Sequence, residues 1–465
     1  MKWRSMVFAL MLLACQIVQG AERPNFVIFV ADDMAWEDCG AYGHPHIRTP
    51  NIDRLAREGL RFDAAFLTCS SCSPSRCSML TGRYPHSTGA GELHLPLPKT
   101  QQLFSTPLRE GGYYTAAVGK WHLGSAAESQ MDLVKTGGGP GGEEDWVSVL
   151  KNRPQDKPFF LWLAATDPHR DYRPGAIDPP HQRSDVVVPP IFPDTPAVRD
   201  DLALYYDEIG RFDHFIGLVR DELASQGVLD NTMILVISDN GRPFPRCKNT
   251  VNEDGVRTPF IVRFPKLVMA QGSTSSLVSS VDIAATVLEL AGVSNDFPTQ
   301  GRSFVPILKD PQASIRSFAF SEHNWHDYRA FERSVRSTKY RYILNELPNL
   351  PGTPPADAVR SPTYREMQRQ RDTGTLPLSA GNVFIVPSPR EGLYDIAADP
   401  HCLNNLVDRL EYHKVLYQHQ QELANWQKDT NDTFPGEDHL TPDGFHRETG
   451  NKLPGIKGAH PSLGK

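Results

Sequence analysis

The sequence predicts an α/β fold: a large domain with a mostly parallel mixed sheet sandwiched by helices, and a smaller C-terminal α+β domain with an antiparallel sheet. Three observations support this class. Short apolar runs alternate with helical patterns over about the first 330 residues, as in a parallel sheet buried on both faces. Four of these runs end directly in polar residues. Beyond that point apolar and polar residues alternate, which is typical of antiparallel strands.

The first elements have clear boundaries in the sequence. Asn25–Val30 is a continuous apolar run and predicts a strand buried on both faces. Thr49 and Pro50 are typical of a helix start, and Gly59 is typical of a helix end. Tyr113–Val118 predicts the second strand. The order strand, helix, strand is that of a parallel sheet.

Three further strands and one long helix follow. Phe159–Ala165 and Thr232–Ile237 predict the third and fourth strands, and Phe260–Phe264 predicts a fifth. Between the third and the fourth, apolar residues recur with helical spacing, which indicates a long helix with one buried face. These residues are Leu202, Tyr205, Ile209, Phe212, Phe215, Ile216, Val219 and Leu223.

Polar residues stand directly after four of the predicted strands. Ligands of such sheets bind beyond the carboxyl ends of the strands, so residues at these four ends should lie close together. We therefore expect one shared site. Its candidates are Asp32, Asp33, Lys120, His122, His169, Asp239 and Asn240.

The C-terminal part has a different pattern. Residues 334–344 and 392–396 predict antiparallel strands, and the proline- and arginine-rich stretch 348–389 between them predicts a long surface insertion. A polar helix with Leu410, Val415, Leu416, Leu423 and Trp426 should follow. We expect the catalytic domain at residues 21–330 and the smaller domain at residues 331–465.

Residues 1–20 are typical of an export signal. Lys2 and Arg4 precede the short apolar stretch Met6–Ala14, and small residues lead up to Ala21. The alternative is lipid attachment at Cys15, but simple cleavage fits the sequence better. We therefore expect a periplasmic or extracellular protein. No stretch of the mature part reaches the roughly 18 apolar residues of a membrane span. The net charge of −7 gives no general attraction to nucleic acid.

Seven cysteines are present, and six remain after removal of the signal. If Cys72 is a catalytic residue, five other cysteines remain, so at least one of them stays out of any disulfide. Two other roles are open for this region. Cys69 and Cys72 have the spacing of a redox pair, and together with Cys77 they could bind zinc or an iron–sulfur cluster. Neither role uses the polar residues at the other strand ends.

The most specific motif is Cys72-Ser73-Pro74-Ser75-Arg76, which continues to Leu80-Thr81-Gly82-Arg83. It resembles the signature of the type I sulfatases, in the alkaline-phosphatase-like superfamily. The resemblance implies that a maturing enzyme oxidises Cys72 to formylglycine. A hydrated aldehyde has two hydroxyl groups: one attacks sulfur, and deprotonation of the other expels sulfate.

The predicted metal site is rich in oxygen. Asp32, Asp33, Asp239 and Asn240 offer only oxygen ligands, which Ca²⁺ and Mg²⁺ prefer over zinc. Three carboxylates brought together would repel one another without a cation. The resemblance favours Ca²⁺ over Mg²⁺ and implies that residue 72 completes the ligand set. Asp32 and Asp33 alone could instead lie in an exposed turn, but this alternative is the weaker one once Asp239 and Asn240 are taken with them.

The resemblance also implies roles for five more residues. Arg76 would hold the hydrated aldehyde and the carboxylates. Lys120 and Lys248 would bind the sulfate group, because cations stabilise charge that spreads onto its oxygens. His122 would accept the proton of the second hydroxyl, and His169 would protonate the leaving oxygen or nitrogen.

A second group of residues predicts contacts with the substrate. Within the family, the sequence is most similar to the branch of heparan N-sulfatases and bacterial polysaccharide sulfatases. His323, Trp325, His326, Arg329 and Arg333 fall between the predicted domains, where a sugar could stack on the indole and an arginine could bind a second anionic group. A polar turn that braces the two domains is an equal alternative.

Together these features predict an exported enzyme that hydrolyses sulfate esters, or sulfamates, of sulfated oligo- or polysaccharides. A phosphonate or phosphate-ester hydrolase with the same aldehyde and metal is the enzymatic alternative. A glycan-binding protein that retains an inactive sulfatase scaffold is the alternative of another class.

Overall fold

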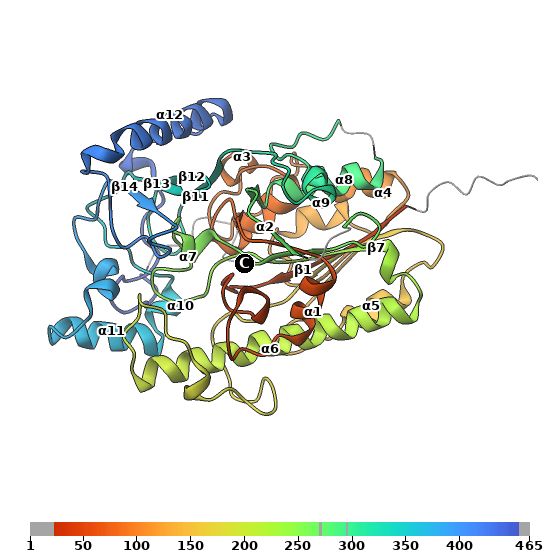
Figure 1. The fold of residues 1–465 in the computed structure, drawn as a ribbon, viewed down its shortest axis with the longest axis horizontal. Helices are drawn as coiled ribbons and strands as arrows, with labels where there is room; N and C mark the ends of the chain where they lie inside the picture. The colour runs from red at the N-terminus through yellow and green to blue at the C-terminus, as the bar shows by residue number, and fades with distance from the viewer. Residues whose placement is uncertain (1–22, 269–271, 294–295, 455–465) are drawn as a thin grey trace, which may run out of the picture.

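The computed structural model of the chain describes residues 23–268, 272–293 and 296–454 (Figure 1). Its centre is an eight-stranded sheet in the order β5-β4-β6-β1-β7-β8-β2-β9. From β5 to β7 all neighbours are parallel, whereas β8 is antiparallel to both β7 and β2. The strands are β1 Asn25–Ala31, β2 Leu60–Phe62, β4 Tyr114–Gly119, β5 Leu133–Thr136, β6 Phe159–Ala164, β7 Thr232–Ser238, β8 Phe260–Arg263 and β9 Gly272–Thr274. The predicted α/β class is confirmed.

The apolar run in β1 has a direct structural reason. Phe26, Ile28 and Val30 belong to one hydrophobic core, and Val27 and Phe29 belong to a second core on the other face of the sheet. Side chains of a strand alternate between its faces, so a sheet covered on both sides needs apolar residues at every position.

Helices cover both faces (Figure 1). The first core includes residues of α2 and α8, and the second includes the long α6 with α1 and α5 packed beside it. The helices of this part are α1 Pro50–Glu58, α2 Cys72–Thr81, α3 Pro85–Thr88, α4 Ser105–Glu110, α5 Trp146–Asn152, α6 Pro196–Ser225, α7 Glu253–Val256, α8 Asp282–Ala291 and α9 Val305–Lys309. A small parallel sheet pairs β3 Ala65–Phe66 with β10 Val278–Ser279.

Helix α1 has the predicted boundaries. Thr49 precedes it, Pro50 is its first residue, and Gly59 follows it. Any side chain at Gly59 would meet the carbonyl oxygen of Val262 in β8, since an added Cβ would lie 2.2 Å from that atom. Glycine is therefore required by close packing of the helix end on the sheet.

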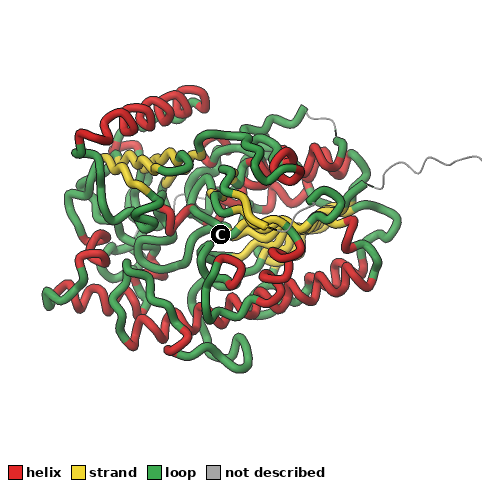
Figure 2. The backbone as a smooth tube through the Cα atoms, viewed as in Figure 1, coloured by secondary structure: helices red, strands yellow, loops and turns green. Residues whose placement is uncertain are grey.

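The C-terminal sheet lies apart from the central one, with loops between the two (Figure 2). Its strands are β11 Ala319–His323, β12 Glu332–Arg336, β13 Tyr340–Asn345 and β14 Glu391–Asp395, all antiparallel in this order. Because β11 starts at Ala319, this sheet includes residues before the predicted boundary at 330. The division into two domains stays a prediction.

One predicted strand of this sheet is wrong in its extent. The run 334–344 is not a single strand, because it turns between β12 and β13. The Ser337 N–H donates to the carbonyl oxygen of Tyr340 over 2.9 Å, and the Tyr340 N–H donates to the Ser337 hydroxyl over 3.1 Å. Alternation of apolar residues continues through this turn and conceals it.

The stretch 348–389 also differs from its prediction. It contains α10 Ala356–Val359 and α11 Pro362–Asp372, and α11 packs on α6. Tyr364 and Met367 are buried in the second core. Ser361 caps α11 by accepting the N–H of Tyr364 over 3.1 Å. Pro355 precedes α10 and Pro362 is the first residue of α11, so these two prolines mark helix starts, and the centre of the stretch is no surface insertion.

The last helix is α12 His413–Thr430, which places Leu423 and Trp426 against the C-terminal sheet. Short 3-10 helices lie at Gly40–Tyr42, Ser125–Gln130, Arg183–Asp185, Leu229–Asn231, Leu378–Phe384, Leu410–Tyr412 and Glu437–His439. Among the described residues, none of the helices has the length and apolar character needed to cross a membrane. The predicted signal at residues 1–20 and Cys15 lie outside the described residues.

Candidate active site

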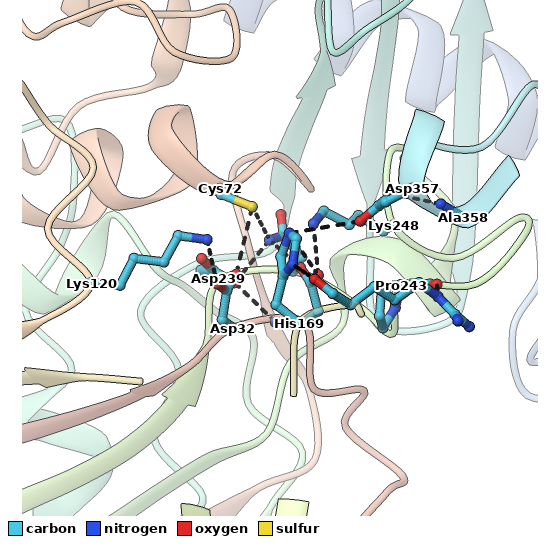
Figure 3. Close-up of polar contacts among 12 residues, drawn as sticks. Asp32, Cys72, Lys120, His169, Asp239, Pro243, Lys248, Asp357 and Ala358 are labelled. Atoms are coloured by element: carbon cyan, nitrogen blue, oxygen red, sulfur yellow. Dashed lines mark hydrogen bonds and ion pairs between the residues drawn. The ribbon is translucent and has the colours of Figure 1, made fainter. Parts of the chain in front are cut away.

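The residues that follow four strands meet in one place (Figure 3). Asp32 and Asp33 follow β1, Lys120 and His122 follow β4, His169 lies beyond β6, and Asp239 and Asn240 follow β7. Figure 3 shows Asp32, Lys120, His169 and Asp239 close together. Helix α2 adds Cys72 from above the sheet. A cavity of about 220 Å³, lined among others by Asp32, Lys120 and His169, opens onto the group. The structure thus brings together the residues that the sequence assigns to a shared site.

Helix α2 is buried along its whole length and starts at Cys72. Pro74 lies in its first turn, where its missing N–H costs no hydrogen bond, and Gly82 ends the helix with a φ of 64°. The Cys72 sulfur lies 3.6 Å from Oδ1 of Asp32 and 3.2 Å from Nδ2 of Asn240. Arg76, one helical turn later, faces the same group.

The environment of Cys72 disfavours redox chemistry. Burial raises the pKa of its thiol to about 12, and the pKa of Cys69 lies well above the ordinary value for the same reason. Reactive thiols need a lowered pKa, because the thiolate is the nucleophile. All six cysteines among the described residues are buried and unpaired.

Asp32, Asp33 and Asp239 form an acidic cluster. None of the three is exposed, and one oxygen from each lies within 4.8 Å of the others. Nδ2 of Asn240 donates to Asp33 and Asp239 over 2.8 Å each. The Oδ1 atom of Asn240 is buried without a hydrogen-bond partner. An unpartnered amide oxygen beside three carboxylates fits a hard divalent cation.

Each carboxylate of the acidic cluster pairs with at least one cation, and Asp32 pairs with both Lys120 and Arg76. Lys120 contacts Asp32, Lys248 lies 2.6 Å from Asp33, and Arg76 donates to Asp239 over 2.7 Å. Burial would raise the pKa of Asp32, but Lys120, His169 and Arg76 hold that pKa below its ordinary value. Burial raises the pKa of Asp33 and of Asp239.

His169 has one ring nitrogen engaged and one available. Its Nδ1 donates to the carbonyl oxygen of Arg170, and since a carbonyl only accepts, Nδ1 carries the proton. Its Nε2 lies 3.8 Å from Oδ2 of Asp33 and 3.7 Å from Oδ2 of Asp357. Burial and the charge of Lys248 lower the pKa of His169. Nε2 is therefore the atom that can exchange a proton.

His122 is held by a residue that the sequence did not single out. Its Nε2 lies 2.7 Å from Nδ1 of His94, and its own Nδ1 is buried without a partner. Burial, Lys120 and His94 lower the pKa of His122 well below the ordinary value, so the ring is neutral. The sequence carries no signal for His94, which is a single histidine in a loop.

Backbone strain gathers at this site. Asp33, His94 and His122 have φ values of 82°, 66° and 62°, in the left-handed region that side chains other than glycine rarely adopt. Such conformations persist only where the surrounding packing holds them, and they cluster at functional sites.

Asp357 is the other site residue that the sequence did not indicate. It lies on α10, inside the stretch predicted to be a surface insertion, and its carboxylate reaches His169 (Figure 3). No motif marks it, because only the packing of α11 on α6 brings this segment to the site.

The predicted substrate residues are mostly buried or already paired. Trp325 is 3% exposed and donates to the carbonyl oxygen of Pro442 over 2.8 Å, so its ring is not open for a sugar. His326 is also 3% exposed and lies 2.8 Å from the hydroxyl of Ser71, behind α2. Arg333 is bound to Asp432 by contacts of 2.6 and 2.8 Å.

His323 and Arg329 line a separate cavity of about 350 Å³ beside the C-terminal sheet. His323 also contacts Glu332 over 3.0 Å. The bracing alternative fits Trp325, His326 and Arg333, because all three are buried, although Trp325 and Arg333 also line a further cavity of about 290 Å³.

Comparison with known proteins gives concordant results. The sequence model of the family "Sulfatase" matches residues 24–148 and 143–293, and the model "N-sulphoglucosamine sulphohydrolase, C-terminal" matches residues 247–345. The human N-sulphoglucosamine sulphohydrolase is 30% identical over 92% of this chain and 93% of its own length. An ulvan-active sulfatase of Formosa agariphila is 30% identical over 87% of this chain and 75% of its own.

Among solved structures, a protein in complex with its substrate D-glucosamine-2-N,6-O-disulfate has a similar fold. Its TM-score is 0.70 at 22% identity, over 89% of this chain and 99% of that one. The predicted family and fold are thereby confirmed. The chain belongs to the sulfatase family and is a sulfuric-ester hydrolase.

Proposed function

We propose that this enzyme hydrolyses sulfate esters and sulfamates of sulfated carbohydrates with a formylglycine made from Cys72 and a Ca²⁺ ion at the acidic cluster. The observation that carries the proposal is the pairing of three buried carboxylates with Arg76, Lys120 and Lys248 around Cys72. A chain with a net charge of −7 attracts anions only where positive charge is concentrated, and a divalent cation added to these three side chains would supply that charge here.

The charge count explains how the site selects a sulfate group. Three carboxylates against Arg76, Lys120 and Lys248 give a sum near zero. A bound divalent cation would add two positive charges, polarise the sulfate group and release the lysines from the carboxylates. Asp32, Asp33, Asp239 and Asn240 would hold that cation, together with residue 72. Ca²⁺ suits this flexible all-oxygen set better than Mg²⁺, which keeps several waters.

The chain's own residues divide the remaining work. Lys120 and Lys248 bind sulfate oxygens; the side chain of Lys248 is 1% exposed and that of Lys120 is 17% exposed, so their charge interactions are stronger than in open solvent. His122 accepts a proton at Nδ1, the atom that has no other partner. His169 delivers a proton from Nε2 to the leaving atom when both ring nitrogens are protonated, because its Nδ1 keeps its own proton on the carbonyl oxygen of Arg170.

The substrate class rests on the relatives. The human relative is named for N-sulphoglucosamine, the ulvan-active relative for a sulfated polysaccharide, and the solved neighbour binds a glucosamine with N- and O-sulfate groups. These names support sulfated carbohydrates as substrates and support amino sugars among them.

Maturation and location complete the proposal. Cys72 is 2% exposed in the folded chain, so a maturing enzyme must reach it before α2 packs. This agrees with export of an unfolded chain by the signal at residues 1–20 to the periplasm or the medium.

The test is sulfate release from defined sulfated mono- and oligosaccharides. The protein is produced with a maturing enzyme, and mass spectrometry of the peptide that contains residue 72 verifies its conversion. Cys72→Ala should abolish sulfate release. Cys77→Ala is the matched control, since Cys77 is a buried thiol of the same helix that packs in the first core instead. Sulfate release by Cys72→Ala would refute the proposal.

Two measurements address the alternatives. Rates on a sulfate and a phosphate ester of one alcohol separate a sulfatase from a phosphonate or phosphate-ester hydrolase, because the charge of the transition state differs. Glycan affinity without sulfate release by fully converted protein would instead indicate a glycan-binding protein.

A further inference from the structure

Asp357 brings a carboxylate from the C-terminal part of the chain into the active site. Its Oδ1 accepts the N–H of Ala358 over 2.7 Å, which fixes the orientation of the group. Its Oδ2 lies 3.7 Å from Nε2 of His169 (Figure 3). This is the nitrogen from which the proposed reaction takes the proton for the leaving atom.

The carboxylate is held rigidly. The N–H of Ala356, the residue before it, donates to Oδ2 of Asp327 over 2.9 Å. On its other side, Ser361 caps α11, and α11 packs on α6 of the large domain. A group fixed in this way loses little entropy when it binds a ligand.

Oδ2 of Asp357 retains the capacity to accept a hydrogen bond. Among the described residues, the 3.7 Å approach to His169 is its only ion pair, and this distance is too long for a hydrogen bond. The side chain is 18% exposed, and its Oδ2 lies 3.7 Å from Nε2 of His169, a residue that lines the active-site cavity. Lys248 and His169 also hold the pKa of Asp357 below its ordinary value against the effect of burial, so the group is an anion.

We propose that Asp357 is a specificity-determining residue that selects substrates with a nitrogen leaving group, namely the sulfamates of amino sugars. The inference rests on the proposed function and names the substrate class of the same site. Oδ2 accepts a hydrogen bond from the N–H of the sulfamate and then pairs with the ammonium group of the product.

Cleavage of a sulfamate forms one bond to sulfur and breaks another. The S–N bond breaks, its electron pair stays on nitrogen, and sulfur bonds to the nucleophilic hydroxyl oxygen of residue 72, whose proton passes to water. His169 supplies the first proton to nitrogen and water supplies the second, so the amino sugar leaves as an ammonium ion.

A fixed carboxylate distinguishes the two kinds of leaving atom by charge. The oxygen that leaves from a sulfate ester gains negative charge in the transition state, and a carboxylate beside it repels that charge. A nitrogen that leaves as an amine becomes a cation after proton uptake, and the same carboxylate attracts it. Asp357 therefore favours S–N over S–O cleavage.

The experiment compares Asp357→Asn with the wild-type enzyme on glucosamine N-sulfate and glucosamine 6-O-sulfate. Asparagine keeps the shape and removes the charge. A hydrogen bond to a charged group is worth enough that its loss should lower kcat/KM for the N-sulfate by about ten- to a hundredfold. The kcat/KM for the 6-O-sulfate should stay within about threefold of the wild-type kcat/KM or rise above it.

The matched control is Glu366→Gln. It removes the same charge from the same segment, at a glutamate of α11 that pairs with Arg369 over 2.7 Å. Both kcat/KM values should remain at the wild-type level in this variant. Thermal unfolding of Asp357→Asn verifies that the fold is intact.

A binding measurement provides a readout that does not depend on turnover. Glucosamine carries the ammonium group and N-acetylglucosamine does not. Calorimetry should show that Asp357→Asn weakens binding of glucosamine by about tenfold and leaves binding of N-acetylglucosamine unchanged.

The outcomes separate this inference from the proposed function. An equal loss on both substrates, or no loss on the N-sulfate, would overturn the role of Asp357. Wild-type enzyme that releases sulfate only from the 6-O-sulfate would overturn it too and leave the sulfatase assignment intact. Converted wild-type protein that releases sulfate from neither sugar nor from an aryl sulfate would overturn both.

Discussion

Replacement of Arg76 by methionine tests whether the acidic cluster is held together by charge. Arg76 is fully buried, and its Nε donates to Asp239 over 2.7 Å while Nη1 donates to the carbonyl oxygen of Lys120 over 2.9 Å. Methionine fills a similar volume but leaves the carboxylate of Asp239 buried without its partner. Breaking a buried pair in this way costs about 3–5 kcal/mol of the free energy of unfolding.

In a chain of 465 residues, a loss of this size lowers the melting temperature by about 3–6 °C. The assay is urea unfolding, followed by fluorescence and circular dichroism, in the presence of a chelator. Added Ca²⁺ should recover part of the loss, because the cation neutralises the carboxylate that the arginine no longer balances.

The control is Arg54→Met. Arg54 is 49% exposed and pairs with Glu58 one helical turn away, over 2.8 Å. Exposed pairs of this kind contribute about 0.3–0.5 kcal/mol. If Arg76→Met destabilises the protein by no more than Arg54→Met does, the three carboxylates are not kept charged by their cations, and the account of the site is wrong.

Three further predictions follow. Ca²⁺ at about a hundredfold excess over its Kd should raise the free energy of unfolding of chelator-treated protein by about 2.7 kcal/mol, and Asp239→Asn should remove most of this gain in the same titration. His94→Ala should lower kcat by about tenfold with little change in KM, because it releases the ring of His122; Michaelis–Menten kinetics will show whether KM changes instead. Burial lowers the pKa of His86, but Glu322 raises it above the ordinary value, so His86 should stabilise the fold most below about pH 6.5 and lose this effect as the pH rises through its pKa. The difference in unfolding free energy between wild type and His86→Gln should therefore be larger at about pH 6 than at about pH 9. An equal difference at both pH values would contradict this prediction.

Several features of this protein follow from the amino-acid sequence alone. The apolar run Asn25–Val30 shows that a strand is buried on both faces, and Thr49, Pro50 and Gly59 mark the ends of a helix. The motif that starts at Cys72 indicates the family. These signals are local, because side-chain alternation, helix caps and motif spacing depend only on neighbours along the chain.

Other features depend on the packing of distant segments. The turn after Arg336 is hidden by continued alternation, and the burial of Trp325 depends on the segment that includes Pro442. His94 and Asp357 reach the site from a loop and from a short helix that no motif marks.

The physical reason is the difference in range between these interactions. A strand or a cap is stabilised by groups a few residues apart, whereas a charge in the active site is placed by whichever segments pack around it. The sequence by itself therefore determined five strands of the central sheet, the family and the residues at the strand ends, but not β2, β5 and β9. Only the tertiary structure decided that Arg333 forms an ion pair with Asp432 and that Asp357 lies beside Nε2 of His169.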